Sequence, residues 1–156
     1  MNSNSEKYFM KIALDLARKS ALEHEVPVGA VVVLKEEIVG TGRNLREKFQ
    51  NSLFHAEINA INEACQNLNS WRLTGCDIFV TLEPCPMCAG AIINSRIKRL
   101  IFGADDPKSG SAGSVIDLFS VPFNHKVELI KGVLNKESSS LLKNFFDSIR
   151  KRTKKI

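Results

Sequence analysis

The chain has 156 residues, 44% of them hydrophobic and 25% charged, which is ordinary for a globular protein with one substantial core. No apolar run approaches the roughly 20 residues of a membrane-spanning helix. The first residues also lack the basic-then-apolar pattern of a signal peptide. We therefore expect a cytoplasmic protein without a membrane partner.

The net charge of +5 is concentrated at the C-terminal end of the chain. Residues 143–156 contain six lysines and arginines against Asp147 alone, whereas the other 142 residues carry sixteen charges of each sign. Such a basic cluster is typical of a surface that binds a polyanion such as nucleic acid. A solvated tail that keeps the protein in solution has the same composition, so the charges leave both interpretations open.

The first half of the chain predicts one helix and two strands. Apolar residues at helical spacing predict an amphipathic helix from Ser5 to about Leu22. The continuous apolar run 29–34 predicts a buried strand, and 38–42 is a plausible antiparallel partner. Residues 43–54 are polar and irregular, so we expect a loop that leads into the next helix.

The middle of the chain predicts a parallel β-α-β unit. Apolar spacing from Ala56 to Leu68 predicts a helix that His55 opens. Strand 77–81, helix 86–94 and strand 99–103 then follow in succession. A site in such a unit is expected at the carboxyl end of the first strand.

The last third of the chain contains a polar, glycine-rich loop over residues 104–114, and 115–119 predicts one helical turn. Residues 127–130 predict a strand, and 136 to about 151 a terminal helix. Most of the apolar stripe on that helix should be core; it consists of Leu141, Leu142, Phe145, Phe146 and Ile149. With no linker or repeat, residues 1–156 predict a single α/β domain, a three-layer α/β/α sandwich around a mixed sheet of about five strands, with a basic segment at 136–156.

Two short motifs together predict a metal site. His55-Ala56-Glu57 and Pro84-Cys85-Pro86-Met87-Cys88 supply one imidazole and two thiolates, which leave one position of a tetrahedral zinc ion open, as in catalytic sites. Cys85 and Cys88 share one face at the start of a helix, where thiol pKa values are lowered. Glu57 can act there as a proton carrier. A surface histidine and an incidental Cys-x-x-Cys are the simpler alternatives for either motif alone.

Other residues that could join such a site are given simpler interpretations. His125 could serve as a fourth ligand, but a surface histidine is favoured, because nothing joins it to the motif. Cys65 and Cys76 predict buried thiols rather than a disulfide. Asn44 has a carboxamide that can read the edge of a base, although a turn-forming asparagine is the alternative without the neighbouring site.

Further motifs extend over nearly the whole chain. They are Glu25 to Ala30, Arg43-Asn44, His55 to Glu57, Ile78 to Thr81, Leu82 to Ala91, Ser95 to Ile97, Phe102 to Ala104 and Phe145-Phe146. With them the chain resembles bacterial tRNA-specific adenosine deaminases, within the cytidine-deaminase-like superfamily. The zinc motif is shared by the superfamily. The loop Gly103 to Lys108, the Arg-Asn pair and the Phe-Phe helix with its basic tail resemble the tRNA branch.

The resemblance implies that the enzyme converts adenosine at the wobble position of a tRNA anticodon to inosine. One zinc per subunit would be bound by His55, Cys85 and Cys88, and Glu57 would carry the proton. The implied substrate-binding residues are Asn44, Val28, Ala56, Pro84, Asp105, Asp106, Lys108, Phe146 and Arg150. The implied partners are the tRNA anticodon stem-loop and a second copy of the chain in a homodimer.

Two alternative functions share parts of this pattern. A deaminase of free guanine, free cytosine or deoxycytidylate would have the same zinc site without needing Lys108 or the basic tail. A structural zinc protein that binds RNA would have a closed metal site and no role for Glu57. The chain also departs from the family before the histidine, where Ser52-Leu53-Phe54 replaces the frequent Pro-Thr-Ala.

Overall fold

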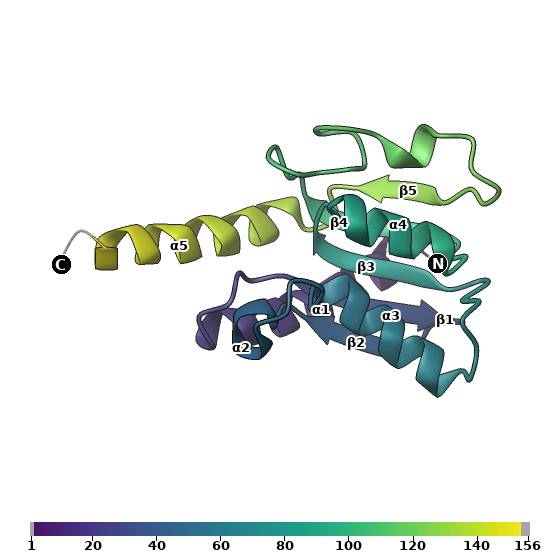
Figure 1. Cartoon of the computed structure of the whole chain (residues 1–156), viewed down its shortest axis with the longest axis horizontal. Helices are drawn as coiled ribbons and strands as arrows, with labels where there is room; N and C mark the ends of the chain where they lie inside the picture. The colour runs from purple at the N-terminus through teal and green to yellow at the C-terminus, as the bar shows by residue number, and fades with distance from the viewer. Residues whose placement is uncertain (1, 154–156) are drawn as a thin grey trace.

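The computed structural model of the protein describes residues 2–153, and Figure 1 shows the arrangement of its elements. In chain order the helices and strands are α1 (Ser3–Leu22), β1 (Gly29–Leu34), β2 (Glu37–Arg43), α2 (Arg46–Phe49), α3 (Ala56–Asn67), β3 (Asp77–Leu82), α4 (Pro86–Asn94), β4 (Arg99–Ala104), the 3₁₀ turn η1 (Leu118–Ser120), β5 (Glu128–Lys131) and α5 (Asn135–Thr153).

The described residues form a mixed five-stranded sheet in the order β2-β1-β3-β4-β5. β1 pairs antiparallel with both β2 and β3, whereas β3, β4 and β5 run parallel to one another. The predicted hairpin and the predicted parallel β3-α4-β4 unit are both confirmed. The carboxyl ends of β3 and β4 therefore meet at one edge of the sheet, which is where the chain enters α4 and the glycine-rich loop.

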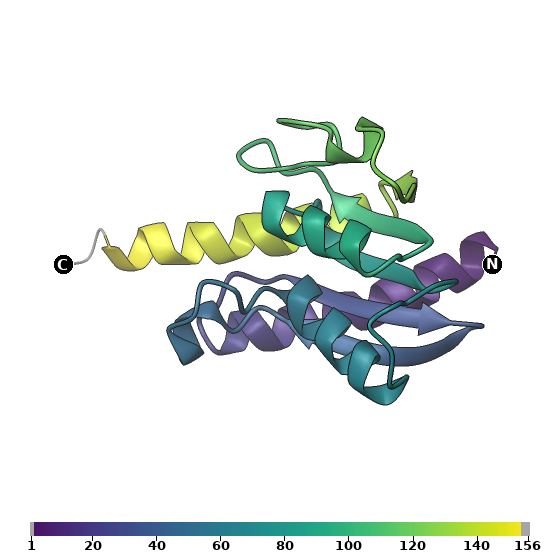
Figure 2. The ribbon, with the colours of Figure 1, turned by 45° about the vertical axis from the view of Figure 1, so that its right-hand side comes forward.

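Alternating side chains of the strands build one core on each face of the sheet. Val31 and Phe79 pack with α1 on one face. Val32 and Ile78 pack on the other face with α3 and α4. Figure 2 shows α3 and α4 together on one side of the strands and α1 on the other. The predicted α/β/α sandwich is confirmed.

Two glycines bring strands unusually close to helices. A Cβ at Gly29 would lie 2.0 Å from the carbonyl oxygen of Ala13 in α1. A Cβ at Gly42 would lie 2.0 Å from the carbonyl oxygen of Ala56, in the first turn of α3. Only glycine fits at such a distance, so the backbone of β2 fixes where α3 begins.

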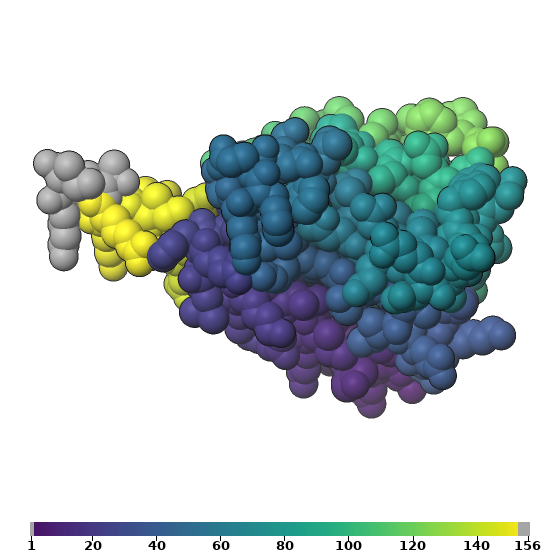
Figure 3. Space-filling model, turned by 60° about the horizontal axis from the view of Figure 1, so that its bottom comes forward, coloured from purple at the N-terminus to yellow at the C-terminus, as the bar shows by residue number. Residues whose placement is uncertain are grey.

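The prediction that most of the apolar stripe of α5 is core was wrong. Of its five described side chains only Phe145 is buried, Leu141 and Leu142 are half-buried, and Phe146 and Ile149 are 41% and 42% exposed. The reason is length: α5 packs on the sheet through its first turns, where Ser138 faces Gly103, and then extends beyond the sheet (Figures 1 and 3). Lys154 and Lys155 of the predicted basic segment lie outside the described residues.

Two shorter predictions also need correction. The segment 43–54 was expected to be irregular but contains α2, because the Glu25 carboxylate accepts hydrogen bonds from the backbone N–H groups of Glu47 and Lys48. The helical turn expected at 115–119 begins later, at Leu118. There the Asp117 side chain accepts from the N–H groups of the next turn, which fixes its start.

The remaining expectations concern single residues. Cys65 and Cys76 are free thiols; Cys76 is buried as expected, whereas Cys65 is half-buried. His125 is half-buried, with its Nε2 2.6 Å from the carbonyl oxygen of Ile97. Within residues 2–153, no helix combines the length and the apolar character needed to cross a membrane.

Candidate active site

Two helix N-termini meet at the predicted metal site. His55 occupies the N-cap position of α3 and Cys85 that of α4, and both have extended backbone geometry. Pro86 occupies the first position of α4, where its missing N–H costs no hydrogen bond. Cys88 follows one turn later on the buried face of α4. The chain thus presents all three side chains where positive helix dipole ends converge.

The distances between these side chains fit a metal ion. His55 Nδ1 lies 3.6 Å from Cys85 Sγ and 3.5 Å from Cys88 Sγ. Bond lengths of about 2.0 Å to nitrogen and 2.3 Å to sulfur in a tetrahedral zinc site require a nitrogen–sulfur separation of about 3.5 Å. Within the described residues this is the one group of three potential ligands from His, Cys, Asp or Glu that lies so close together, so the protein supplies three ligands rather than four.

The ionisable groups of the site perturb one another strongly. The hydrogen bond from Cys88 lowers the pKa of the Cys85 thiol to about 4, and His55 adds to this effect. The same bond, together with burial, raises the pKa of Cys88. Burial raises the pKa of the Glu57 carboxyl to about 7, which suits a group that must both take and return a proton near neutral pH.

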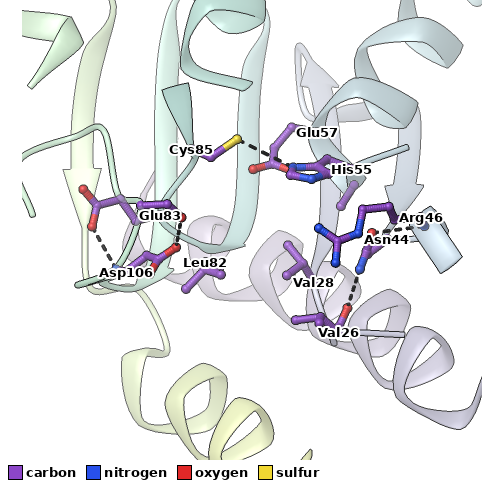
Figure 4. Close-up of a pocket in the computed structure, with 12 residues that line it drawn as sticks. Val26, Val28, Asn44, Arg46, His55, Glu57, Leu82, Glu83, Cys85 and Asp106 are labelled. Atoms are coloured by element: carbon purple, nitrogen blue, oxygen red, sulfur yellow. Dashed lines mark hydrogen bonds between the residues drawn. The ribbon is translucent and has the colours of Figure 1, made fainter. Parts of the chain in front are cut away.

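A cavity of about 150 Å³ opens beside these residues (Figure 4). This volume suits one small planar group rather than a ligand of several hundred Å³. Seven residues singled out from the sequence line it: Val28, Asn44, His55, Ala56, Glu57, Cys85 and Asp106. The remaining lining residues, Val26, Arg46, Leu82, Glu83 and Ser109, were not predicted.

A second cavity, of about 570 Å³, adjoins the first and shares five of its lining residues. The glycine-rich loop contributes Asp105, Asp106 and Lys108 to its wall, and α5 contributes Phe146. The part of α5 that extends beyond the sheet therefore borders the approach to the cluster of potential metal ligands. This arrangement explains why Phe146 remains exposed: it faces the second cavity rather than the core.

Comparisons with known proteins agree with this geometry. A family model described as MafB19-like deaminase matches residues 3–150. The tRNA-specific adenosine deaminase of Bacillus subtilis is 46% identical over 150 residues, which cover 96% of this chain and 93% of the relative. The chain belongs to the tRNA-specific adenosine deaminase family.

Another relative and a solved structure support the same assignment. The tRNA-specific adenosine deaminase of Buchnera aphidicola is 42% identical, covering 96% of this chain and 99% of the relative. A structure from studies of A-to-I editing by tRNA:A34 deaminases at the wobble position of transfer RNA superposes with a TM-score of 0.84. It is 42% identical and covers 86% of this chain and 99% of its own.

Three predicted site residues of this family member lie outside both cavity walls. Cys88 is buried behind Cys85, and Pro84 is buried between β3 and α4. Arg150 lies on α5 one turn beyond Phe146, where it forms an ion pair with Asp147. The other predicted residues line one cavity or both.

Asn44 is held in place by the backbone on both sides of its amide. Its Nδ2 donates to the carbonyl oxygen of Val26 at 3.2 Å, and its Oδ1 accepts from the N–H of Arg46 at 3.3 Å. The side chain is 8% exposed and faces the cavity (Figure 4). It therefore organises a turn, which is one of the two interpretations from the sequence, and it also lines the cavity.

Phe54 packs against α2. Its ring lies 5.1 Å from the ring of Phe49 in α2, and it is not among the residues that line either cavity. Phe54 therefore bears on how α2 is held, not directly on the wall of either cavity.

The unpredicted lining residues differ in how visible they are in the sequence. Arg46 is a basic residue in the polar segment before His55, and its place in both cavities marks it as a charged residue at their junction. Glu83 stands within the Leu82-Glu83-Pro84-Cys85 motif, so proximity to the ligands could have drawn attention to it. Val26, Leu82 and Ser109 carry no signal beyond their positions next to other motif residues.

Proposed function

We propose that the protein is a zinc-dependent hydrolase that converts adenosine at the wobble position of a tRNA anticodon to inosine, and that residues 1–156 act as a single deaminase domain. The observation that carries this proposal is the cluster of His55, Cys85 and Cys88 beside Glu57, next to a cavity with room for one nucleobase. The identity to tRNA-specific adenosine deaminases supports the substrate.

The proposed chemistry divides between the metal and one carboxyl group. Zinc held by the three ligands would lower the pKa of a water molecule and so make it a nucleophile near neutral pH. Glu57 takes a proton from the attacking water and gives it to the ring nitrogen. It then carries the second proton from the new hydroxyl group on C6 to the amino group, which leaves as ammonia while the carbonyl of inosine forms. The buried position of Glu57 favours this role, because burial raises its pKa to about 7.

Binding of the base would use the walls of the first cavity. Val28 and Ala56 offer apolar surface on which a purine ring can rest. Asn44 presents its carboxamide with a fixed orientation, because Val26 and Arg46 hold both ends of that amide. An anticodon loop already presents unpaired bases, so extruding one of them costs less than from a duplex.

The second cavity is suited to the rest of the anticodon loop. Lys108 and Arg46 can neutralise phosphates, and exposed Phe146 offers a face for stacking of a flanking base. Asp105 and Asp106 offer acceptors to base or ribose hydroxyl groups. Arg150 extends the basic surface along α5.

Two further parts of the proposal concern assembly and location. We propose a homodimer, as the family resemblance implies; large apolar side chains such as Trp71 and Leu53 are 54% and 55% exposed and could be covered in it. Sedimentation equilibrium would test this, and a monomer at micromolar concentration would contradict it. A tRNA substrate also implies a cytoplasmic location.

The proposed function is tested by incubating zinc-loaded protein with an anticodon stem-loop that carries adenosine at the wobble position. Free adenosine, cytidine and guanine are assayed in parallel for ammonia release. Inosine from the RNA alone supports the proposal. Ammonia from a small base alone would instead favour the free-base deaminase and would refute the tRNA assignment.

Two variants separate the enzyme from a structural zinc protein. Glu57→Ala should retain zinc and lose turnover, whereas Cys88→Ala should lose both. Full activity of the Glu57 variant would contradict the mechanism. Unfolding on metal removal, in a wild-type protein that shows no deaminase turnover, would favour the structural alternative.

A further inference from the structure

Two buried carboxylates lie beside the cavities without taking part in the chemistry above. Glu25 is 1% exposed and Glu83 is 2% exposed. A carboxylate is costly to bury unless hydrogen bonds replace its water. Both carboxylates accept hydrogen bonds from backbone N–H groups of the segments that form the cavity walls. Glu83 also accepts one from a hydroxyl group.

Glu83 binds the glycine-rich loop at both of its ends. Its Oε2 accepts from the N–H of Asp106 at 2.9 Å, as Figure 4 shows, and from the hydroxyl of Ser114. Its Oε1 accepts from the N–H groups of Ala112 at 2.8 Å and Ser114 at 3.1 Å. These four bonds fill the acceptor sites of a carboxylate, which leaves none for a substrate.

The loop is shaped to admit this carboxylate. A Cβ at Gly110 would lie 2.4 Å from the carboxyl carbon of Glu83. Burial opposes ionisation of Glu83, but the bonds from Ser114, Asp106 and Ala112 outweigh it and hold the pKa of this carboxyl below its ordinary value. The loop therefore closes around a charged group that is anchored at the end of β3.

Glu25 binds the opposite wall in the same way. Its two oxygens accept from the N–H groups of Glu47 at 3.1 Å and Lys48 at 2.7 Å. These donors belong to the first turn of α2, where no intrahelical acceptor exists. α2 begins with Arg46, which lines both cavities.

We propose that Glu25 and Glu83 are positioning residues that set the separation of the two cavity walls. Glu83 holds the wall with Asp106 and Lys108, and Glu25 holds the wall with Arg46. A displacement of about 1 Å in substrate-positioning groups can lower catalytic efficiency, kcat/KM, by up to about a hundredfold, and for groups that hold the cavity walls we expect that loss in KM. The kinetic part of this inference rests on the proposed function, whereas the structural part does not.

The test uses the full-length, zinc-loaded protein with Glu83→Gln and Glu25→Gln. Glutamine keeps the shape but turns an NH₂ group toward one of the backbone donors. Backbone hydrogen exchange, measured by mass spectrometry, should become at least about tenfold faster in residues 105–114 of Glu83→Gln and in residues 46–48 of Glu25→Gln. Neither variant should accelerate exchange in the segment that the other carboxylate anchors. KM for the stem-loop should rise about tenfold with little change in kcat or zinc content.

A matched control is available in Glu63. Its carboxylate also accepts from a backbone N–H and a hydroxyl, both of Thr41, but it lies outside the walls of the two cavities. Glu63→Gln should accelerate exchange near Thr41 and leave KM unchanged. Gly110→Ala provides a second route to the same wall, since it displaces the Glu83 carboxylate without removing it.

The outcomes are separable. Unchanged exchange in both wall segments of the two glutamine variants overturns the positioning role, whatever the substrate proves to be. Faster exchange with an unchanged KM overturns its consequence for binding. If wild-type protein makes no inosine, the proposed function fails, while segment-specific exchange still supports the anchoring of the walls.

Discussion

Replacing Gly42 by alanine should damage the metal site from a distance. The added Cβ would lie 2.0 Å from the carbonyl oxygen of Ala56 and 2.5 Å from the nitrogen of Ala60, both in the backbone of α3. Ordinary contact begins at 3.4 Å, so the first turn of α3 must retreat by about 1.4 Å. That turn begins at His55, one of the three potential ligands.

The size of the effect follows from this displacement. Metal-ligand distances tolerate deviations of only about 0.2 Å. We expect zinc affinity to fall about 10- to 100-fold, which is the loss typical when the support of a ligand is disturbed. Overpacking should also lower the free energy of unfolding by about 1–3 kcal/mol, and thus the Tm by roughly 3–10 °C.

Gly40→Ala is the matched control, because its Cβ would meet the same helix one turn later, at Ala60 and Ala64. Both variants should unfold at lower temperature by calorimetry. Competition with a chromophoric chelator should show the larger loss of zinc affinity in Gly42→Ala. Wild-type affinity and Tm in that variant would refute the claim that the β2 backbone positions the start of α3.

Three other substitutions test separate parts of the account. Glu57→Gln should keep the metal and lower single-turnover rates by at least about 100-fold, as expected for loss of an acid-base group; a wild-type rate would contradict its role. Lys108→Ala should reduce the slope of log affinity against log salt by about one, and an unchanged slope would exclude a phosphate contact. Asp77→Ala removes the partner to which Arg99 donates at 2.8 and 2.6 Å. It should lower the free energy of unfolding by roughly 2–4 kcal/mol, because the largely buried Arg99 loses its main partner. Glu6, which remains 3.6 Å from Arg99, limits the loss. An unchanged Tm would show that this pair contributes little.

The parts of the fold that sequence reasoning predicted are those encoded locally. Apolar runs identified β1 and β3 because strands buried on both faces need no polar alternation. His55 and Cys85 mark the starts of α3 and α4 because each motif combines a potential metal ligand with the onset of helical spacing. These signals lie within a few residues of the feature that they predict.

The parts that were missed depend on contacts between distant segments. α2 forms because Glu25, 22 residues before Glu47, supplies its N-terminal acceptor. The apolar residues of α5 have helical spacing throughout, but that spacing does not show that the helix extends beyond the sheet and leaves Phe146 beside a cavity. The role of Glu83 likewise cannot be read from its neighbours in the sequence, because its hydrogen-bond donors lie in a loop more than 20 residues later.

The most direct test of the central claim is inosine formation in the wobble-adenosine stem-loop before and after removal of zinc. Chelation should abolish inosine formation in the wild-type protein, and stoichiometric zinc, one ion per subunit, should restore it. Inosine formation at the full rate by protein shown to contain no metal would contradict the account.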